Sequence, residues 1–143
     1  MACLDLFAGS GALGFEALSR GAASAVMVEK DPAALRALRG NASKLGASNL
    51  TVVRGDALEF ARETRSRFDV VFVDPPYRSN LQAAALSLIR GLLSRHGRVY
   101  AESASPFEPP RGWTVLKSSR AGNVHFYLLA GDADDQSGVS GNV

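Results

Sequence analysis

Residues 4–14 read Leu-Asp-Leu-Phe-Ala-Gly-Ser-Gly-Ala-Leu-Gly, and this stretch decides the fold. Its apolar start is typical of a buried strand, and its glycines have the spacing G-x-G-x-x-G. We expect Gly9 to permit a sharp turn, Gly11 to let a ligand approach the backbone, and Gly14 to let a helix pack closely on the strand. A helix N-terminus directly after such a turn binds polar and anionic groups. The stretch therefore predicts a strand–turn–helix cradle for a nucleotide cofactor.

The apolar pattern on either side of this cradle predicts alternating strands and helices. Strands are expected at residues 2–7, 25–29, 50–53, 68–73, 98–102, 113–117 and 124–130. Helices are expected at residues 11–20, 32–45, 56–65 and 80–93. The last two strands are joined by a connection too short for a parallel crossover, so they form an antiparallel pair. The predicted fold class is α/β: a Rossmann-like, seven-stranded, mostly parallel sheet with helices on both faces and a late antiparallel hairpin.

Length and composition indicate one domain. The chain has 143 residues and a net charge of +2, so we expect a domain over residues 1–130 and a disordered Gly/Ser/Asp-rich tail over residues 131–143. No apolar run reaches the ~20 residues that span a bilayer, and no signal peptide is recognisable, so no membrane partner is expected. The single cysteine, Cys3, suits a reducing cytoplasm. The mildly basic body permits a nucleic-acid partner.

Four acidic residues lie at or just after the ends of predicted parallel strands: Asp5, Glu29, Asp56 and Asp74. In an open α/β sheet these ends line the ligand crevice. We expect Glu29, which follows Gly9 by 20 residues, to accept hydrogen bonds from ribose hydroxyls. Asp56 could contact an adenine amino group, cap the next helix, or do both. Asp5 is expected near the amino-acid end of a cofactor.

The sequence Asp74-Pro75-Pro76-Tyr77 is a more specific signal. The exocyclic amine of a nucleobase is a poor nucleophile because its lone pair is delocalised into the ring, so its protons must be held by acceptors. The Asp74 carboxylate and the Pro75 carbonyl can supply two neighbouring acceptors. The prolines would stiffen this backbone, and Tyr77 can stack on the base. The motif therefore favours methyl transfer to an amino group.

These residues resemble the class I S-adenosylmethionine-dependent methyltransferases, whose first motif is similar to Asp5-Leu-Phe-Ala-Gly-Ser-Gly and whose amino-methylating members have a motif similar to Asp74-Pro-Pro-Tyr. The longer run over residues 4–22 closely resembles the RsmD family, which methylates the exocyclic N2 of a guanine in bacterial 16S ribosomal RNA. Val28-Glu29-Lys30-Asp31 and Ala121-Gly122-Asn123-Val124 are also similar to that family. The resemblance spans about residues 3–130.

The resemblance implies a set of site residues. Those that would contact S-adenosylmethionine are Asp5, Phe7, Ala8, Gly9, Ser10, Gly11, Glu29, Lys30, Asp56 and Ala57. The catalytic residues holding the guanine would be Asp74, Pro75 and Tyr77, and Arg78 and Arg120 are candidates for phosphate contacts. The implied partner is ribosomal RNA or the small-subunit particle, bound by a protein for which a monomer is favoured, and no metal is needed.

Members of the family also carry a basic N-terminal segment before the first motif, which takes part in substrate recognition and in closing the cofactor site. The present chain begins almost at the first strand. We therefore expect it to fold but to bind RNA poorly, and to have low activity, by itself.

Other functions share parts of this pattern. A nicotinamide dehydrogenase would share the glycine turn and Glu29 but gives no reason for residues 74–77. Cytosine C5 methylation needs a cysteine nucleophile, and Cys3 lies in the first predicted strand. Protein glutamine methylation usually goes with Asn at position 74. A DNA adenine or cytosine amino methyltransferase and a catalytically weak RNA-binding remnant of the same fold stay open as alternatives.

Overall fold

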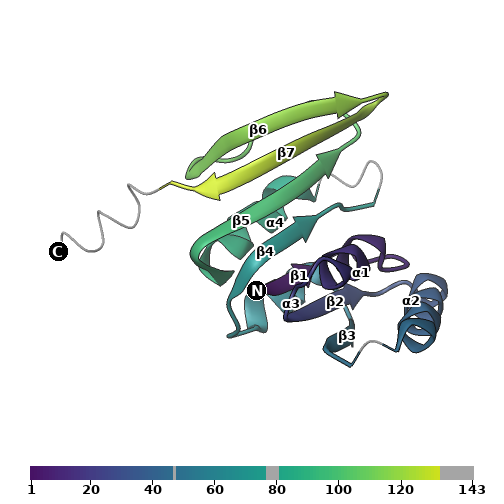
Figure 1. Cartoon of the computed structure of the whole chain (residues 1–143). Coiled ribbons are helices and arrows are strands. Elements are labelled where there is room, and N and C mark those ends of the chain that lie inside the picture. Colours follow the sequence, from purple (N-terminus) through teal and green to yellow (C-terminus); the bar gives the residue numbers. More distant parts are fainter. Residues whose placement is uncertain (47, 77–80, 133–143) are drawn as a thin grey trace.

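The computed structural model describes residues 1–46, 48–76 and 81–132, which form one seven-stranded sheet flanked by helices (Figure 1). The strands are β1 (Ala2–Asp5), β2 (Ser24–Glu29), β3 (Leu50–Arg54), β4 (Phe68–Val73), β5 (Leu93–Ser103), β6 (Trp113–Ala121) and β7 (Val124–Gly131). The helices are α1 (Ala12–Ser19), α2 (Pro32–Leu45), α3 (Ala57–Glu63), α4 (Gln82–Ile89) and the 3₁₀ turn η1 (Arg90–Leu92).

The strand order is β3-β2-β1-β4-β5-β7-β6. Strands β1 to β5 pair in parallel, whereas β7 is antiparallel to both β5 and β6. The order reverses between β1 and β4, which makes their carboxyl ends the switch point where ligands bind in such sheets. The predicted fold class, including the late antiparallel hairpin, is confirmed.

Two apolar cores cover the two faces of the sheet. One core contains α2 residues Leu35 and Leu38 with Phe15 of α1 packed against them, and the other contains Ala61 of α3 and Leu86 of α4. Figure 1 shows the corresponding arrangement, with α1 and α2 on one side of the strands and α3 and α4 on the other. Both faces of the central strands are therefore buried, as their continuous apolar sequences predict.

Local sequence signals account for where α2 begins and ends. The Asp31 side chain accepts a 2.9 Å hydrogen bond from the amide of Ala34, and Pro32 occupies the first helical position. Gly46 closes the helix with a φ of 62°, in the left-handed region that glycine adopts without strain. The predicted cap and end of this helix are confirmed.

Strand β5 is longer than predicted. Residues 80–93 were expected to form one helix, but α4 ends at Ile89, η1 follows, and β5 begins at Leu93 rather than at Arg98. The pairing with β4 shifts between Phe68 and Val70, so the β5 residues between the two registers form an irregular segment. His96, expected in a loop, lies in this segment with a φ of 68°. Helical periodicity could not reveal this, because the segment is fixed by pairing with β4.

The other strand limits differ by a few residues. Strand β1 ends at Asp5 rather than Phe7, although the amide of Ala8 still donates to the carbonyl of Val28 at 3.0 Å. Strand β6 extends to Ala121, because the hairpin needs only a two-residue turn. Strand β7 includes Gly131, the first residue of the predicted tail. Residues 133–143 of that tail lie outside the described residues.

Candidate active site

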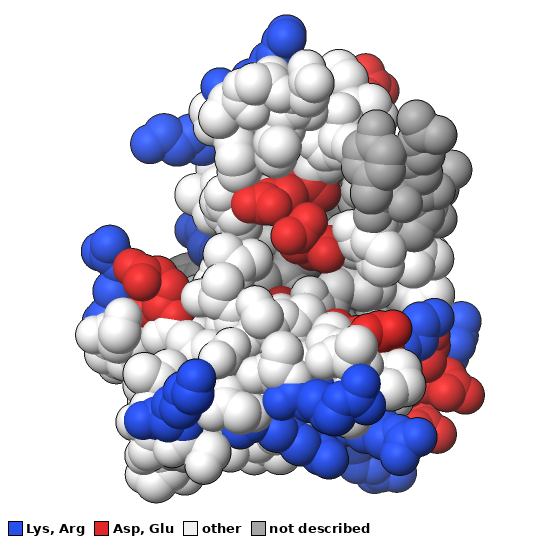
Figure 2. All heavy atoms as spheres, turned by 90° about the vertical axis from the view of Figure 1, so that its right-hand side faces the viewer, with Lys and Arg blue, Asp and Glu red and all other residues white. Residues whose placement is uncertain are grey.

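A cavity of about 620 Å³ lies beyond the carboxyl ends of β1, β2, β3 and β4. Figure 2 faces this edge of the sheet and shows acidic side chains beside a hollow near its middle. Apolar and polar side chains from the glycine turn, from the strand ends and from α1 and α3 line the cavity: Leu6, Phe7, Ala8, Gly9, Ser10, Ala12, Leu13, Val28, Glu29, Lys30, Gly55, Asp56, Ala57, Leu58, Asp74, Pro75, Pro76 and Leu81.

The glycine turn has left-handed backbone at two positions, Gly9 with a φ of 58° and Gly11 with a φ of 96°. A Cβ at Gly9 would meet no atom within 4 Å, so this glycine leaves open space at the cavity wall. A Cβ at Gly11 would lie 2.5 Å from Phe15 Cε2 and 2.6 Å from Leu38 Cδ1. Close packing of Phe15 and Leu38 therefore requires a glycine at position 11, and Gly11 is absent from the cavity lining.

Gly14 has the predicted role. It is buried in α1, and a Cβ there would overlap the terminal methyl of Met27 on β2. Met27 is itself fully buried. The helix that follows the glycine turn consequently lies closer to the sheet than a larger residue would allow.

Glu29 connects the glycine turn after β1 to the loop that follows β2. Its Oε1 accepts a 2.8 Å hydrogen bond from the amide of Gly9, and its Oε2 accepts from the amides of Lys30 at 3.1 Å and Asp31 at 2.8 Å. A carboxylate has about four acceptor positions, so at least one remains for a ligand hydroxyl. The sequence predicted a ligand contact here, but not the structural role.

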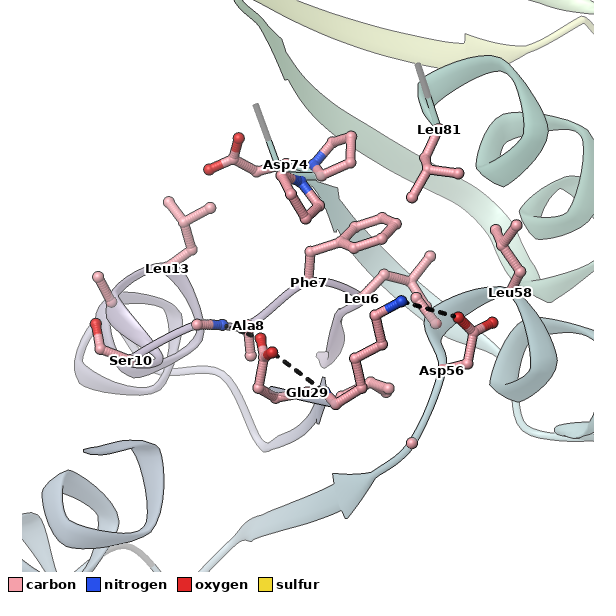
Figure 3. A pocket seen from close by; sticks show the side chains of 18 residues that line it. Leu6, Phe7, Ala8, Ser10, Leu13, Glu29, Asp56, Leu58, Asp74 and Leu81 are labelled. Carbon is pink, nitrogen blue, oxygen red and sulfur yellow. Dashed lines mark hydrogen bonds and ion pairs between the residues drawn. The ribbon is translucent and has the colours of Figure 1, made fainter. Parts of the chain in front are cut away.

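Asp56 and Lys30 form an ion pair at the cavity rim, with Lys30 Nζ 3.8 Å from Asp56 Oδ1 (Figure 3). Asp56 Oδ2 accepts a 3.0 Å hydrogen bond from the amide of Glu59, so the residue caps α3 as well as lining the cavity. Ala57, the first residue of α3, also lines it. The two roles considered for Asp56 are therefore compatible.

Asp5 lies below the cavity rather than on its wall. It is 2% exposed, and neither carboxyl oxygen has a hydrogen-bond partner of ordinary geometry within the described residues. Burial raises the pKa of Asp5 to about 7, an effect opposed by the nearby amides of Gly14 and Phe7 and reinforced by the charge of Asp74. Asp5 thus differs from the three other strand-end acids, which reach the cavity surface.

Asp74 and Pro75 directly follow β4 and lie at the far side of the cavity from Glu29, as Figure 3 shows for the two acids. Phe7 lies between them and supplies an aromatic wall. Tyr77 and Arg78 lie outside the described residues. Arg120, the second candidate for a phosphate contact, is exposed and donates through Nε to the carbonyl of Gly122 at 2.8 Å.

The sequence reasoning missed Glu102, at the carboxyl end of β5. Burial, the charge of Asp74 and a side-chain hydrogen bond with Asp74 together raise the pKa of Glu102 to about 7. A smaller cavity of about 270 Å³ lies beside the pair and is lined by Asp74, Pro75, Pro76, Gln82, Glu102, Ser103, Ala104, Asn123 and Val124. The strand-end rule that singled out Asp74 applies to Glu102 as well.

The structure thus brings most of the predicted site residues to one cavity. Those that line it are Phe7, Ala8, Gly9, Ser10, Glu29, Lys30, Asp56, Ala57, Asp74 and Pro75. Asp5 and Gly11 do not. Among the residues that the structure describes, no three His, Cys, Asp or Glu side chains are grouped as metal ligands, and no helix has the length and apolar character needed to cross a membrane.

Known proteins with similar sequences and structures extend these observations. Residues 1–130 match the family described as Conserved hypothetical protein 95. The ribosomal RNA small subunit methyltransferase D of Escherichia coli K12 is 38% identical over 94% of this chain and 71% of its own length. The Haemophilus influenzae protein of the same name is 38% identical over 88% of this chain and 69% of its own length.

A solved structure of a conserved hypothetical protein from Streptococcus pyogenes superposes with a TM-score of 0.83 at 31% identity, covering 92% of this chain and 86% of that one. TrmN from Thermus thermophilus shares the fold, with a TM-score of 0.80 at 24% identity, over 92% of this chain and 44% of that one. The family match and the identity to its curated members together show that the chain belongs to the RsmD family of small-subunit ribosomal RNA methyltransferases.

Proposed function

We propose that this protein transfers a methyl group from S-adenosylmethionine to the exocyclic N2 of a guanine in 16S ribosomal RNA. One observation carries the proposal: a single cavity is lined by the glycine turn and Glu29 at one end and by Asp74 and Pro75 at the other. The first end has the features of a nucleotide-cofactor cradle. The second presents two acceptors suited to an amino group.

The cavity residues fit S-adenosylmethionine. Apolar side chains such as Leu6, Val28 and Leu58 provide walls for an adenine ring, and Glu29 retains acceptor capacity for the ribose hydroxyls. Asp56 Oδ1, which lies 3.8 Å from Lys30 Nζ, could accept from the adenine amino group in place of Lys30. The open space at Gly9 allows close approach of the methionine part. Bound there, the cofactor supplies an electrophilic methyl group.

The chain's own residues act on the nucleophile. The Asp74 carboxylate and the Pro75 carbonyl would accept the two N2 hydrogens, which directs the N2 lone pair toward the methyl carbon. Bound S-adenosylmethionine would supply that methyl carbon and would keep the electron pair of the broken S–C bond as a neutral thioether. One N2 proton then leaves to a carboxylate or to water. Tyr77 is proposed to stack on the base.

The proposed substrate follows from the family. Its curated members are named for small-subunit ribosomal RNA, and the amino-directed motif is retained here. We propose ribosomal RNA, free or within the small-subunit particle, as the partner, contacted by a monomer. Arg78 and Arg120 are proposed phosphate contacts.

The cofactor proposal is tested by calorimetric titration of the protein with S-adenosylmethionine, S-adenosylhomocysteine and NAD. Binding of the first two but not of NAD is the expected result. Saturable binding of NAD alone would overturn the proposal in favour of a dehydrogenase. In the same titration, Asp74→Ala should still bind S-adenosylmethionine. In a separate assay with ribosomal RNA, this variant should lose methyl transfer.

A further inference from the structure

The smaller cavity shares three wall residues, Asp74, Pro75 and Pro76, with the cavity of about 620 Å³ that is proposed to hold the cofactor. A base whose amino group is held by Asp74 and Pro75 can therefore have its remaining edge in the smaller cavity, which holds about 270 Å³. Four polar residues on that cavity have no role in the proposed reaction so far: Gln82, Glu102, Ser103 and Asn123. Of these, Glu102 is in direct contact with Asp74.

The sheet fixes Asp74 and Glu102 as a pair. Val73 of β4 is in register with Ala101 of β5, so Asp74 and Glu102 are the next residues on two neighbouring parallel strands. Side chains at matched positions of neighbouring strands lie on the same face of a sheet. Gln82 also donates through Nε2 to the Glu102 carbonyl at 3.4 Å, which holds the end of β5 against α4.

We propose that Glu102 is a specificity-determining residue that accepts the N1–H of the target guanine while Asp74 accepts from N2. The inference rests on the proposed function. Guanine presents adjacent N1–H and N2–H donors along one edge, whereas adenine and cytosine present an unprotonated ring nitrogen beside their amino group. Two neighbouring carboxyl groups match the first pattern. An ionised Glu102 would face a ring nitrogen lone pair in the second, which is unfavourable.

A shared proton allows the carboxyl groups of Asp74 and Glu102 to lie in contact without charge repulsion. Two carboxyl groups in contact are stabilised by one proton between them, and burial together with the neighbouring Asp74 raises the pKa of Glu102 to about 7. When guanine binds, its N1–H and N2–H groups would replace the shared proton, which leaves to water. Tyr100, whose side chain hydrogen-bonds to Glu102, helps to hold this carboxyl in place. The Asn123 amide on the same cavity wall could donate to guanine O6.

The test compares 16S ribosomal RNA carrying guanosine at the methylated position with the same RNA carrying 2-aminopurine there. 2-Aminopurine keeps the 2-amino group, but its N1 accepts a hydrogen bond instead of donating one. With S-adenosylmethionine as donor, the wild-type chain is expected to prefer guanosine about 10- to 100-fold in kcat/KM. Glu102→Gln, whose amide can donate to an unprotonated N1, is expected to reduce that preference about tenfold. Glu108→Gln, an exposed acid after β5, should keep the wild-type preference.

Equal loss with both RNAs in Glu102→Gln would assign the residue a purely structural role and overturn the inference. A wild-type chain that methylates both RNAs equally well would overturn it without any variant. Each of these results leaves the proposed function intact, because guanosine is still methylated. A wild-type chain that binds S-adenosylmethionine but does not methylate guanosine RNA would overturn the proposed function and this inference together.

Discussion

The amide of Gly9 donates a 2.8 Å hydrogen bond to Oε1 of Glu29, a residue that lies 20 positions later in the chain. This bond links the glycine turn after β1 to the end of β2, the two elements that form one wall of the cavity. The opposite oxygen of Glu29 holds the amides of Lys30 and Asp31 just before α2. One carboxylate thus fixes the shape of the cofactor end of the site.

Replacing this carboxylate should weaken both folding and cofactor binding. In Glu29→Gln the amide nitrogen cannot accept, so at least one of the three backbone donors loses its partner. We expect the free energy of unfolding to fall by about 1–2 kcal/mol and the Kd for S-adenosylmethionine to rise about tenfold. Chemical denaturation and calorimetry measure the two effects. Glu63→Gln, an exposed acid at the end of α3, is the control, and an unchanged Kd in Glu29→Gln would contradict the assignment.

Asp74 should affect the reaction far more than cofactor binding. Asp74→Ala removes a side-chain acceptor for the amino group, so kcat should fall by about 100-fold or more. The Kd for S-adenosylmethionine should change by less than about threefold, because the cofactor end of the cavity is unaltered. Single-turnover methylation of ribosomal RNA and calorimetry separate the two quantities. A variant with near-normal kcat would show that Asp74 does not hold the nucleophile.

Replacing a glycine by alanine should change the free energy of unfolding in opposite directions at two positions, one in α1 and one in α2. Gly14→Ala places a methyl group against the buried Met27 side chain, so we expect a loss of about 1–3 kcal/mol in the free energy of unfolding. Gly40 is exposed in α2, and a Cβ there would meet no atom within 4 Å, so Gly40→Ala should stabilise the protein by about 0.5–1 kcal/mol. Urea unfolding of both variants checks the signs, and a stabilising Gly14→Ala would refute close packing of α1 on β2.

The buried Asp5 should make stability fall as pH rises. Its pKa is raised from 3.8 to about 7 in the folded protein, so between these values the folded state retains a proton that the unfolded state has lost. Its contribution is fully present below about pH 4 and declines by about 1.4 kcal/mol per pH unit until the pH passes about 7. Asp5→Asn should abolish this dependence.

Urea unfolding at pH 5 and pH 7 tests the Asp5 prediction. The stability difference between Asp5→Asn and the wild-type chain should move in favour of the variant by about 2 kcal/mol over that interval. Glu102 and the remaining titratable groups contribute equally to both proteins, so their effects cancel. Parallel pH profiles would mean that Asp5 is ionised in the folded state throughout.

Much of this arrangement could be predicted from local sequence. The cap at Asp31, the turn at Gly9 and the position of Asp74 after an apolar strand each depend on residues within a few positions of one another. Strand ends in a parallel sheet meet at one edge whatever the details of packing. The location of the cavity and most of its polar lining followed from that rule alone.

The features that sequence did not predict depend on contacts between distant segments. The role of Gly11 is set partly by Leu38, which reaches it from another helix. The start of β5 follows from its irregular pairing with β4, and the contact of Glu102 with Asp74 follows from the register of the same two strands. The burial of Asp5 likewise arises from surrounding elements rather than from its own neighbours in sequence. Periodicity and motif spacing do not contain this information.

The most direct test of the proposed function is to identify the methylated atom. Unmethylated 16S ribosomal RNA, free and in small-subunit particles, would be incubated with the protein and isotopically labelled S-adenosylmethionine, digested to nucleosides and analysed by mass spectrometry. We expect label in N2-methylguanosine and its loss in Asp74→Ala. Label in a methylated adenosine or cytidine, or none in RNA from a protein that binds S-adenosylmethionine, would contradict the proposal.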